Sequence, residues 1–266
     1  MNQDQVKEIL LSIDDDVEEF FVIFSGKKSK KANGIYHPET REIIIHNRNF
    51  SSDGELIYTA IHEFAHHVHF TRSPVPVGAR AHTVEFRSIL HRLLSAAEER
   101  GVYASPFESD PDLSALTERI RSEFLVQNGR LMKRFGEVLL EAQALCAKKG
   151  ARFEDYLERA LSLDKSTATT LMKFQTYDIS PELGYDTMTT IAQMPTQQKR
   201  IEAQRRFEAG DTVDMIKNDF SPSRPRDVDP TRQLEKERNR IQRTIHSLQE
   251  KLKEIDSRLS NLDSSG

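Results

Sequence analysis

Two histidines and a glutamate near residue 62 have the spacing of a catalytic metal site. The segment His62-Glu63-Phe64-Ala65-His66 matches the pattern H-E-x-x-H. Residues four positions apart are neighbours on one face of a helix, so His62 and His66 can direct ring nitrogens at one ion. Glu63 can take a proton from an activated water without binding the ion itself. This spacing predicts a zinc hydrolase with His62 and His66 as zinc ligands and Glu63 as the catalytic base.

The motif supplies two ligands, and a catalytic zinc ion needs a third from the protein. The downstream residues of suitable type are His82, Glu85, His91 and Glu98. Their spacing from the motif does not choose among them. Residue type alone therefore leaves the third ligand open.

Other polar residues near the motif are candidates for supporting roles. Tyr36, Arg80 and His91 are candidates for holding the oxyanion that forms when a carbonyl is attacked, and no spacing rule selects one of them. His67 and His69 lie on helix faces that differ from the face of the metal ligands. We expect these two histidines at the surface or behind the ligands.

The elements around the motif predict an α+β domain over residues 1–103. An amphipathic helix over 5–13 and an apolar, aromatic strand over 20–24 come first. Two β-rich runs within 34–46, joined by the turn Pro38-Glu39-Thr40, predict a hairpin. We therefore expect a small sheet that supports the motif.

The motif itself lies on a predicted long helix. Ser52 or Asp53 can cap this helix, because each has a side-chain oxygen that accepts the first backbone N–H groups. The helix should end near residue 70, since the proline-containing segment 72–78 cannot continue it. A second helix is predicted over about 83–99 from its apolar stripe.

The first 100 residues or so resemble the SprT-like metalloproteases. That family has a strand hairpin before the active-site helix, then H-E-x-x-H, then a third histidine that opens the next helix. The matching residues here are Tyr36, Ile43-Ile44-Ile45-His46, His62-Glu63-Phe64-Ala65-His66-His67 and His82-Thr83-Val84-Glu85-Phe86. The chain departs from the pattern at Thr83, where glycine is usual.

This resemblance implies a zincin-like metalloprotease domain in which His82 is the third zinc ligand. Glu85 is the rival, because ImmA/IrrE-type proteases share the first motif and use an acidic third ligand. SprT-like proteases act on DNA-bound or crosslinked proteins. The resemblance therefore implies a zinc endopeptidase with DNA-associated protein substrates.

Beyond a Pro/Ser/Asp-rich boundary near residue 104 the pattern is helical almost to the end. We expect a linker and connecting helix over 104–135, then an all-helical domain over 136–220. The predicted helices are 113–126, 136–149, 153–161, 165–176, 185–194, 196–208 and 213–218. The pair 153–161 and 165–176, with a short turn and Asp164 as the cap, has the outline of a helix-turn-helix.

Residues 136–210 resemble ParB/KorB-type and phage-associated helix-turn-helix domains. The matching pieces are Gly136–Ala142, Leu163–Ala168 and the helices within 188–206. The resemblance implies DNA contacts by Lys165, Ser166, Thr167, Thr169, Thr170 and Lys173. A purely structural helical bundle is the alternative, because residues 130–220 contain 14 basic and 14 acidic side chains.

The C-terminal segment has the most regular apolar spacing in the chain. After a linker over 221–233, alternating three- and four-residue steps join Leu234, Ile241, Ile245, Leu248, Leu252, Ile255, Leu259 and Leu262, with Arg238 as the interruption. Such a period favours a coiled coil over 234–262, because supercoiling keeps the seam against a partner helix. We expect a homo-oligomer; a single helix that folds back on its own domain is the alternative.

Composition limits the classes of function and location. The net charge of −4 argues against a wholly basic nucleic-acid binder, although one face can still be basic. No apolar stretch approaches the roughly 20 residues of a membrane span. The single cysteine, Cys146, excludes an internal disulfide and fits the cytoplasm; we expect it to be buried on a helix.

These patterns predict a cytoplasmic zinc endopeptidase that acts on DNA-bound or DNA-associated proteins. One alternative is an ImmA/IrrE-like regulatory protease that cleaves a specific repressor. Another is a non-catalytic DNA-binding scaffold with structural zinc. Glu63 speaks against the scaffold, because a structural site has no need of a base there.

Overall fold

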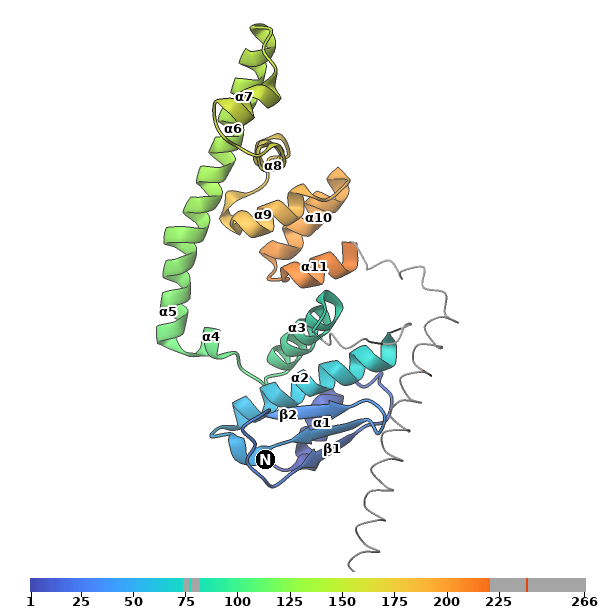
Figure 1. The fold of residues 1–266 in the computed structure, drawn as a ribbon. Helices are drawn as coiled ribbons and strands as arrows, with labels where there is room; N and C mark the ends of the chain where they lie inside the picture. Colours follow the sequence, from blue (N-terminus) through green and yellow to red (C-terminus); the bar gives the residue numbers. More distant parts are fainter. Residues whose placement is uncertain (74–76, 78–81, 221–237, 239–266) are drawn as a thin grey trace, which may run out of the picture. The chain divides into compact units, whose positions relative to one another are not determined.

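The computed structural model describes residues 1–73, 77, 82–220 and 238. Its first part contains α1 (Gln3–Ile13), β1 (Phe21–Phe24), β2 (Gly34–His37), β3 (Glu42–Ile45), η1 (Asn47–Asn49), α2 (Asp53–Arg72) and α3 (Val84–Glu99). These elements follow the order predicted from the sequence. The chain is mostly helical with one small sheet, which confirms the α+β class (Figure 1).

The three strands form a sheet in the order β1-β3-β2. β1 pairs with β3 in parallel, and β2 pairs with β3 antiparallel, as the predicted hairpin requires. Side chains alternate along β3, where Ile43 and Ile45 are buried. β2 is therefore an edge strand, and only one of its sides is paired within the described sheet.

One hydrophobic core joins the sheet to the first three helices. α1 packs against β1, and α2 packs against β2, β3 and α3. The buried side chains come from every layer: Val6, Leu10 and Ile13 of α1, Val22, Ile43 and Ile45 of the sheet, Ile57, Ile61 and Phe64 of α2, and Phe86, Leu90 and Leu93 of α3. This core holds the motif helix α2 in place.

The helices α2 and α3 each begin with a side-chain cap. Ser52 caps α2 by accepting a hydrogen bond from the Glu55 backbone N–H. Thr83, the position at which the family resemblance fails, caps α3 by accepting from the Phe86 N–H. A side-chain oxygen at this position satisfies a helix N–H that glycine would leave to water.

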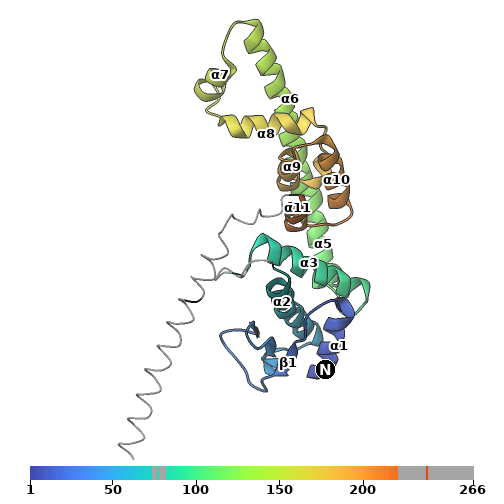
Figure 2. The same cartoon turned by 90° about the vertical axis from the view of Figure 1, so that its right-hand side faces the viewer.

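The second part is all-helical. It contains α4 (Pro106–Ser109), α5 (Pro111–Ile120), η2 (Arg121–Leu125), α6 (Val126–Lys148), α7 (Phe153–Arg159), α8 (Lys165–Thr176), η3 (Pro181–Leu183), α9 (Tyr185–Ala192), α10 (Gln197–Glu208) and α11 (Val213–Phe220) (Figure 2). Leu139, Leu171, Phe174 and Ile191 are among the residues of its separate core. Asp164 caps α8, and Cys146 is buried on α6, as predicted.

One predicted helix break is wrong. We expected separate helices over 113–126 and 136–149, whereas α5, the π-helical η2 and α6 follow one another without interruption from 111 to 148. Gly129 and Gly136 lie inside α6, where an added Cβ would be 2.3 Å from the Pro181 carbonyl oxygen and 2.0 Å from that of Leu171. These glycines allow close packing and do not end the helix.

α11 packs against α3 within the same compact unit. Arg87 of α3 forms an ion pair with Asp214 of α11, with 2.8 Å between Nε and Oδ2. Arg92 and Asp219 form a second ion pair between the same helices.

Among the described residues, no helix combines the length and apolar character needed to cross a bilayer. The predicted coiled coil at 234–262 lies outside the described residues, apart from Arg238.

Candidate metal centre

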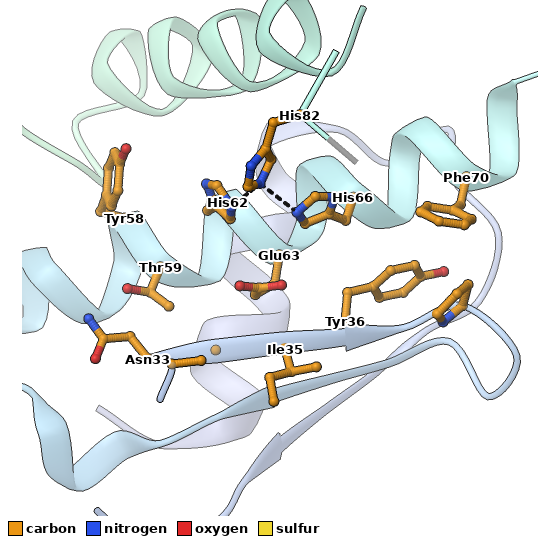
Figure 3. Close-up of a pocket in the computed structure, with 13 residues that line it drawn as sticks. Asn33, Ile35, Tyr36, Tyr58, Thr59, His62, Glu63, His66, Phe70 and His82 are labelled. Carbon is orange, nitrogen blue, oxygen red and sulfur yellow. Dashed lines mark hydrogen bonds between the residues drawn. The ribbon is translucent and has the colours of Figure 1, made fainter. Parts of the chain in front are cut away.

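The motif helix presents two of the three histidines of a candidate metal site. His62 and His66 are one turn apart on α2, and their ring centroids are 5.1 Å apart. Glu63 points from the same helix toward β2 (Figure 3). The core packing of α2 fixes the side from which these groups face the cleft.

His82 completes the group from the residue before the α3 cap. Its Nε2 lies 3.1 Å from Nε2 of His62 and 3.2 Å from Nε2 of His66 (Figure 3). The guanidinium of Arg87 donates to the His82 carbonyl oxygen at 3.0 Å and so ties the backbone of His82 to α3. Within the described part of the chain, this is the group of histidine, cysteine and acidic side chains close enough to hold a metal ion.

Phe86 packs against all three histidine rings. Its ring stacks on His66 with a centroid distance of 4.2 Å, and it lies 4.7 Å from His82 and 5.2 Å from His62. Phe86 is buried in the core on α3. One aromatic side chain therefore restricts the orientation of every candidate ligand.

Burial keeps the histidines of the motif neutral. It lowers the pKa of His62 to about 4 and that of His66 to about 3, and the neighbouring imidazoles add a smaller effect in the same direction. Neutral imidazole has the lone pair that binds a metal. His62 and His66 are therefore in their metal-binding form at neutral pH.

Glu63 is the buried acid of the site. Burial raises the pKa of its carboxyl to about 7, and a hydrogen bond from the Tyr36 backbone N–H partly offsets that rise. Gly34 of β2 lies directly against it: an added Cβ there would be 2.8 Å from Glu63 Cγ and 2.9 Å from Thr59 Cγ2. The carboxyl therefore occupies space that a side chain on β2 would fill.

A cleft of about 520 Å³ lies between the motif helix and β2. Ligand candidates His62, His66 and His82 line it together with Glu63, and the β2 residues Gly34, Ile35 and Tyr36 form its other side (Figure 3). The cleft is thus lined by three candidate metal ligands, an acidic side chain and the edge strand of the sheet. Such an arrangement suits an extended chain bound beside the sheet.

The structure separates the other candidate ligands from the cluster. Glu85 faces away toward His69, with 3.4 Å between His69 Nε2 and Glu85 Oε2. His91 Nδ1 lies 2.7 Å from the Thr212 hydroxyl on the helical side. Neither of these residues, nor Glu98, belongs to the group found within the described residues.

The structure decides between the two places expected for His67 and shows what the Tyr36 hydroxyl contacts. His67 is fully buried and not at the surface. Its Nε2 lies 2.9 Å from the Glu18 carbonyl oxygen, so Nε2 must donate; Nδ1 then accepts from the Tyr36 hydroxyl at 3.1 Å. Because its hydroxyl is held by His67, Tyr36 is not poised as an oxyanion donor in this arrangement. Arg80, another oxyanion candidate, lies outside the described residues.

The six predicted DNA-contacting residues all lie on α8. Lys165, Ser166 and Thr169 are exposed, whereas Thr167, Thr170 and Lys173 are half-buried. The Lys165 ammonium pairs with Glu154 of α7 at 3.1 Å, and the Thr170 hydroxyl donates to the Ser166 carbonyl oxygen. The start of α8 therefore offers a polar face with one lysine already paired.

Sequence reasoning missed two supporting features of the metal centre. Gly34 in a strand could have signalled a close approach of another group, because glycine in a strand often does. The Tyr36–His67 hydrogen bond joins residues 31 positions apart, and no spacing pattern predicts it.

Comparison with protein-family models, curated proteins and solved structures gave no match to this chain.

Proposed function

We propose that the protein is a zinc-dependent endopeptidase, with His62, His66 and His82 as the metal ligands and Glu63 as the catalytic base. The convergence of three Nε2 atoms beside a buried glutamate is the observation that supports this most. A tetrahedral ion with zinc–nitrogen bonds of about 2.0–2.1 Å separates its ligand nitrogens by about 3.3–3.4 Å. The observed separations of 3.1 Å and 3.2 Å are close to that geometry.

The donor set also favours zinc by its chemistry. Three imidazole ligands suit zinc, and a site with three protein ligands keeps a fourth position for water or substrate. When bound there, zinc would polarise a substrate carbonyl and lower the pKa of a coordinated water to about 7. A purely structural zinc site would be closed by a fourth protein ligand.

Glu63 has the position and the proton affinity for acid–base catalysis. Its pKa near 7 means that the carboxyl can take up a proton from the attacking water and return it to the leaving amine. A bound cation favours the carboxylate form and so prepares it to act as the base. Gly34 and the Tyr36 N–H hold the carboxyl in the cleft during both transfers.

The edge strand supports a polypeptide substrate. An extended segment can pair with the outer side of β2 through main-chain hydrogen bonds, which brings its carbonyl groups along the cleft. DNA-associated proteins are the proposed substrates, with α8 as the proposed DNA contact. The short α7–α8 pair and the exposed start of α8 support that part of the proposal.

Glu63→Gln is the decisive variant. It leaves the three histidines in place, so the zinc content should stay at the wild-type level. Cleavage of a DNA-bound protein should fall by about 10²–10⁴-fold, the usual contribution of such proton transfer. Near-normal cleavage by this variant would refute the role of Glu63, and zinc absent from the wild type would refute the metal site.

A DNA arm of the same assay tests the helical region. We expect DNA to stimulate cleavage by the wild type, and the Lys165→Ala/Lys173→Ala variant to lose that stimulation. Its cleavage of an unfolded protein without DNA should be unchanged. Equal stimulation of both proteins would remove α8 from the proposal and leave the metal centre untouched.

A further inference from the structure

The outer face of α6 carries an apolar side chain at every seventh position. Phe124, at the end of η2, and Leu131, Val138 and Leu145 of α6 are 62%, 61%, 50% and 56% exposed. A seven-residue apolar repeat is the spacing by which one helix packs along another. Single exposed apolar residues need no explanation, but a regular row of them marks an interaction surface.

This row lies opposite the side of α6 that is buried in the helical core. The buried residues of α6 include Gly129, Gly136, Leu139 and Cys146. Leu131 and Val138 follow the two glycines by two positions, which is about 200° around a helix. Figure 1 shows α8 and α9 along one side of α6 and no described helix or strand along the other.

Charged side chains between the apolar positions indicate what fits the row. Arg134 lies midway between Leu131 and Val138, and Glu141 lies midway between Val138 and Leu145. Both are exposed, and among the described residues no ion pair involves either of them. Leu131 and Leu145 each lie seven positions from Val138, and Arg134 and Glu141 lie on opposite sides of Val138 with opposite charges.

We propose that α6 pairs antiparallel with α6 of a second copy of this chain, with Val138 on the two-fold axis. Leu131 then packs against Leu145 of the partner copy, and Arg134 faces Glu141 of the partner copy. A two-fold interface needs a surface that is complementary to itself, and this arrangement supplies it. A parallel pair would instead bring Arg134 against Arg134 and Glu141 against Glu141, which repel.

The test must separate this surface from the sequence-predicted coiled coil at 234–262. We therefore start from the full chain with Leu248→Asp and Leu252→Asp, which places charges in the C-terminal seam. Sedimentation velocity should still show a dimer of this parent chain at micromolar concentrations. A parent that is monomeric even at about 100 µM, where a dimer with a micromolar dissociation constant would dominate, would overturn the proposal.

Adding Val138→Asp to the parent should make it monomeric, because a charge then lies on the two-fold axis. Ile201→Asp is the matched control: Ile201 is 62% exposed, but it lies on α10, away from the row. Both variants should keep the parent's circular dichroism and melting temperature, since both positions are exposed. Equal association of the Val138 and Ile201 variants would also overturn the proposal.

Charge reversal tests the direction of pairing. Arg134→Glu and Glu141→Arg should each weaken association by at least about tenfold, because each places like charges together twice in the dimer. The double variant should restore the parent's association. In a parallel pair neither reversal changes the number of like-charge contacts, so unchanged association of the single variants would contradict the antiparallel arrangement.

Discussion

At the residue scale, four side chains were candidates for the third ligand. His82 is the one that lies beside His62 and His66. Glu85 is only three positions away in sequence, but its carboxylate contacts His69 and not the other candidate ligands. His82 precedes the Thr83 cap of α3, whereas Glu85 lies in the first turn of the helix. The two side chains therefore start from different points of the backbone. The structure thus brings the histidine, and not the acidic residue, to the other two candidate ligands.

The third-ligand assignment predicts a clear order of metal affinities. His82→Ala should weaken zinc binding by more than the roughly 10–100-fold that loss of an outer-shell partner costs, because a direct ligand is lost. Glu85→Ala should weaken it by less than that range. Competition with a zinc chelator measures both values. The reverse order would favour an acidic third ligand.

Gly34 predicts a variant that harms catalysis and spares the metal. Gly34→Ala places a methyl group within 2.8 Å of Glu63 Cγ, so the carboxyl or β2 must shift. A misplacement of about 1 Å can cost about 100-fold in rate. We expect such a loss in turnover with zinc affinity close to that of the wild type.

Gly54→Ala is the control for that substitution. Gly54 lies in the first turn of α2, and the nearest atom to an added Cβ is Ser52 Oγ at 4.0 Å. Its turnover should match that of the wild type. Full activity of Gly34→Ala would show that the close approach of β2 does not position Glu63.

At the scale of the elements, α6 shows how packing overrides local preference. Glycine disfavours helix by about 1 kcal/mol relative to alanine, and α6 contains two glycines within eight residues. The helix continues because α8 and η3 approach α6 so closely at these positions that only glycine fits. The two glycines, which have low helix propensity, therefore mark the places where other elements pack closely against α6.

This explanation predicts the sign of a stability change. In an isolated helix, Gly136→Ala should stabilise by about 1 kcal/mol. In the whole protein we expect the opposite sign, because the added Cβ would lie 2.0 Å from the Leu171 carbonyl oxygen and would force α6 and α8 apart. Urea unfolding followed by circular dichroism measures the difference. A more stable variant would contradict the tight crossing.

At the scale of the whole molecule, the described residues form two hydrophobic cores in different stretches of the chain. The first contains α1, the sheet, α2 and α3, and the second contains the helices from α6 to α11. The candidate metal ligands all border the first core. Metal binding should therefore stabilise the first core directly.

Metal removal tests this division. A ligand present at about 1,000 times its dissociation constant stabilises the state that binds it by about 4 kcal/mol. In differential scanning calorimetry, a chelator should thus lower the melting temperature of the first core by more than that of the second, which contacts it through α3 and α11. His62→Ala should melt at the same temperature with and without the chelator. An equal shift of both transitions in the wild type would show that the cores unfold together.

The sequence by itself determined the features that depend on neighbours along the chain. The one-turn spacing of His62 and His66, the cap Asp164 and the hairpin at β2 and β3 follow from local geometry, which the order of residues specifies. The strands and helices around the motif were therefore predictable. The predicted break between the helices at 113–126 and 136–149 was an error of the same local reasoning.

Only the tertiary structure decided the contacts between distant segments. It selected His82 as the third member of the cluster, buried His67 behind Tyr36 and placed Gly34 against Glu63. In each case the partners are at least 16 residues apart, and their approach depends on how α2, β2 and α3 pack around one core. A spacing rule describes one element, whereas the metal centre is made where several elements meet.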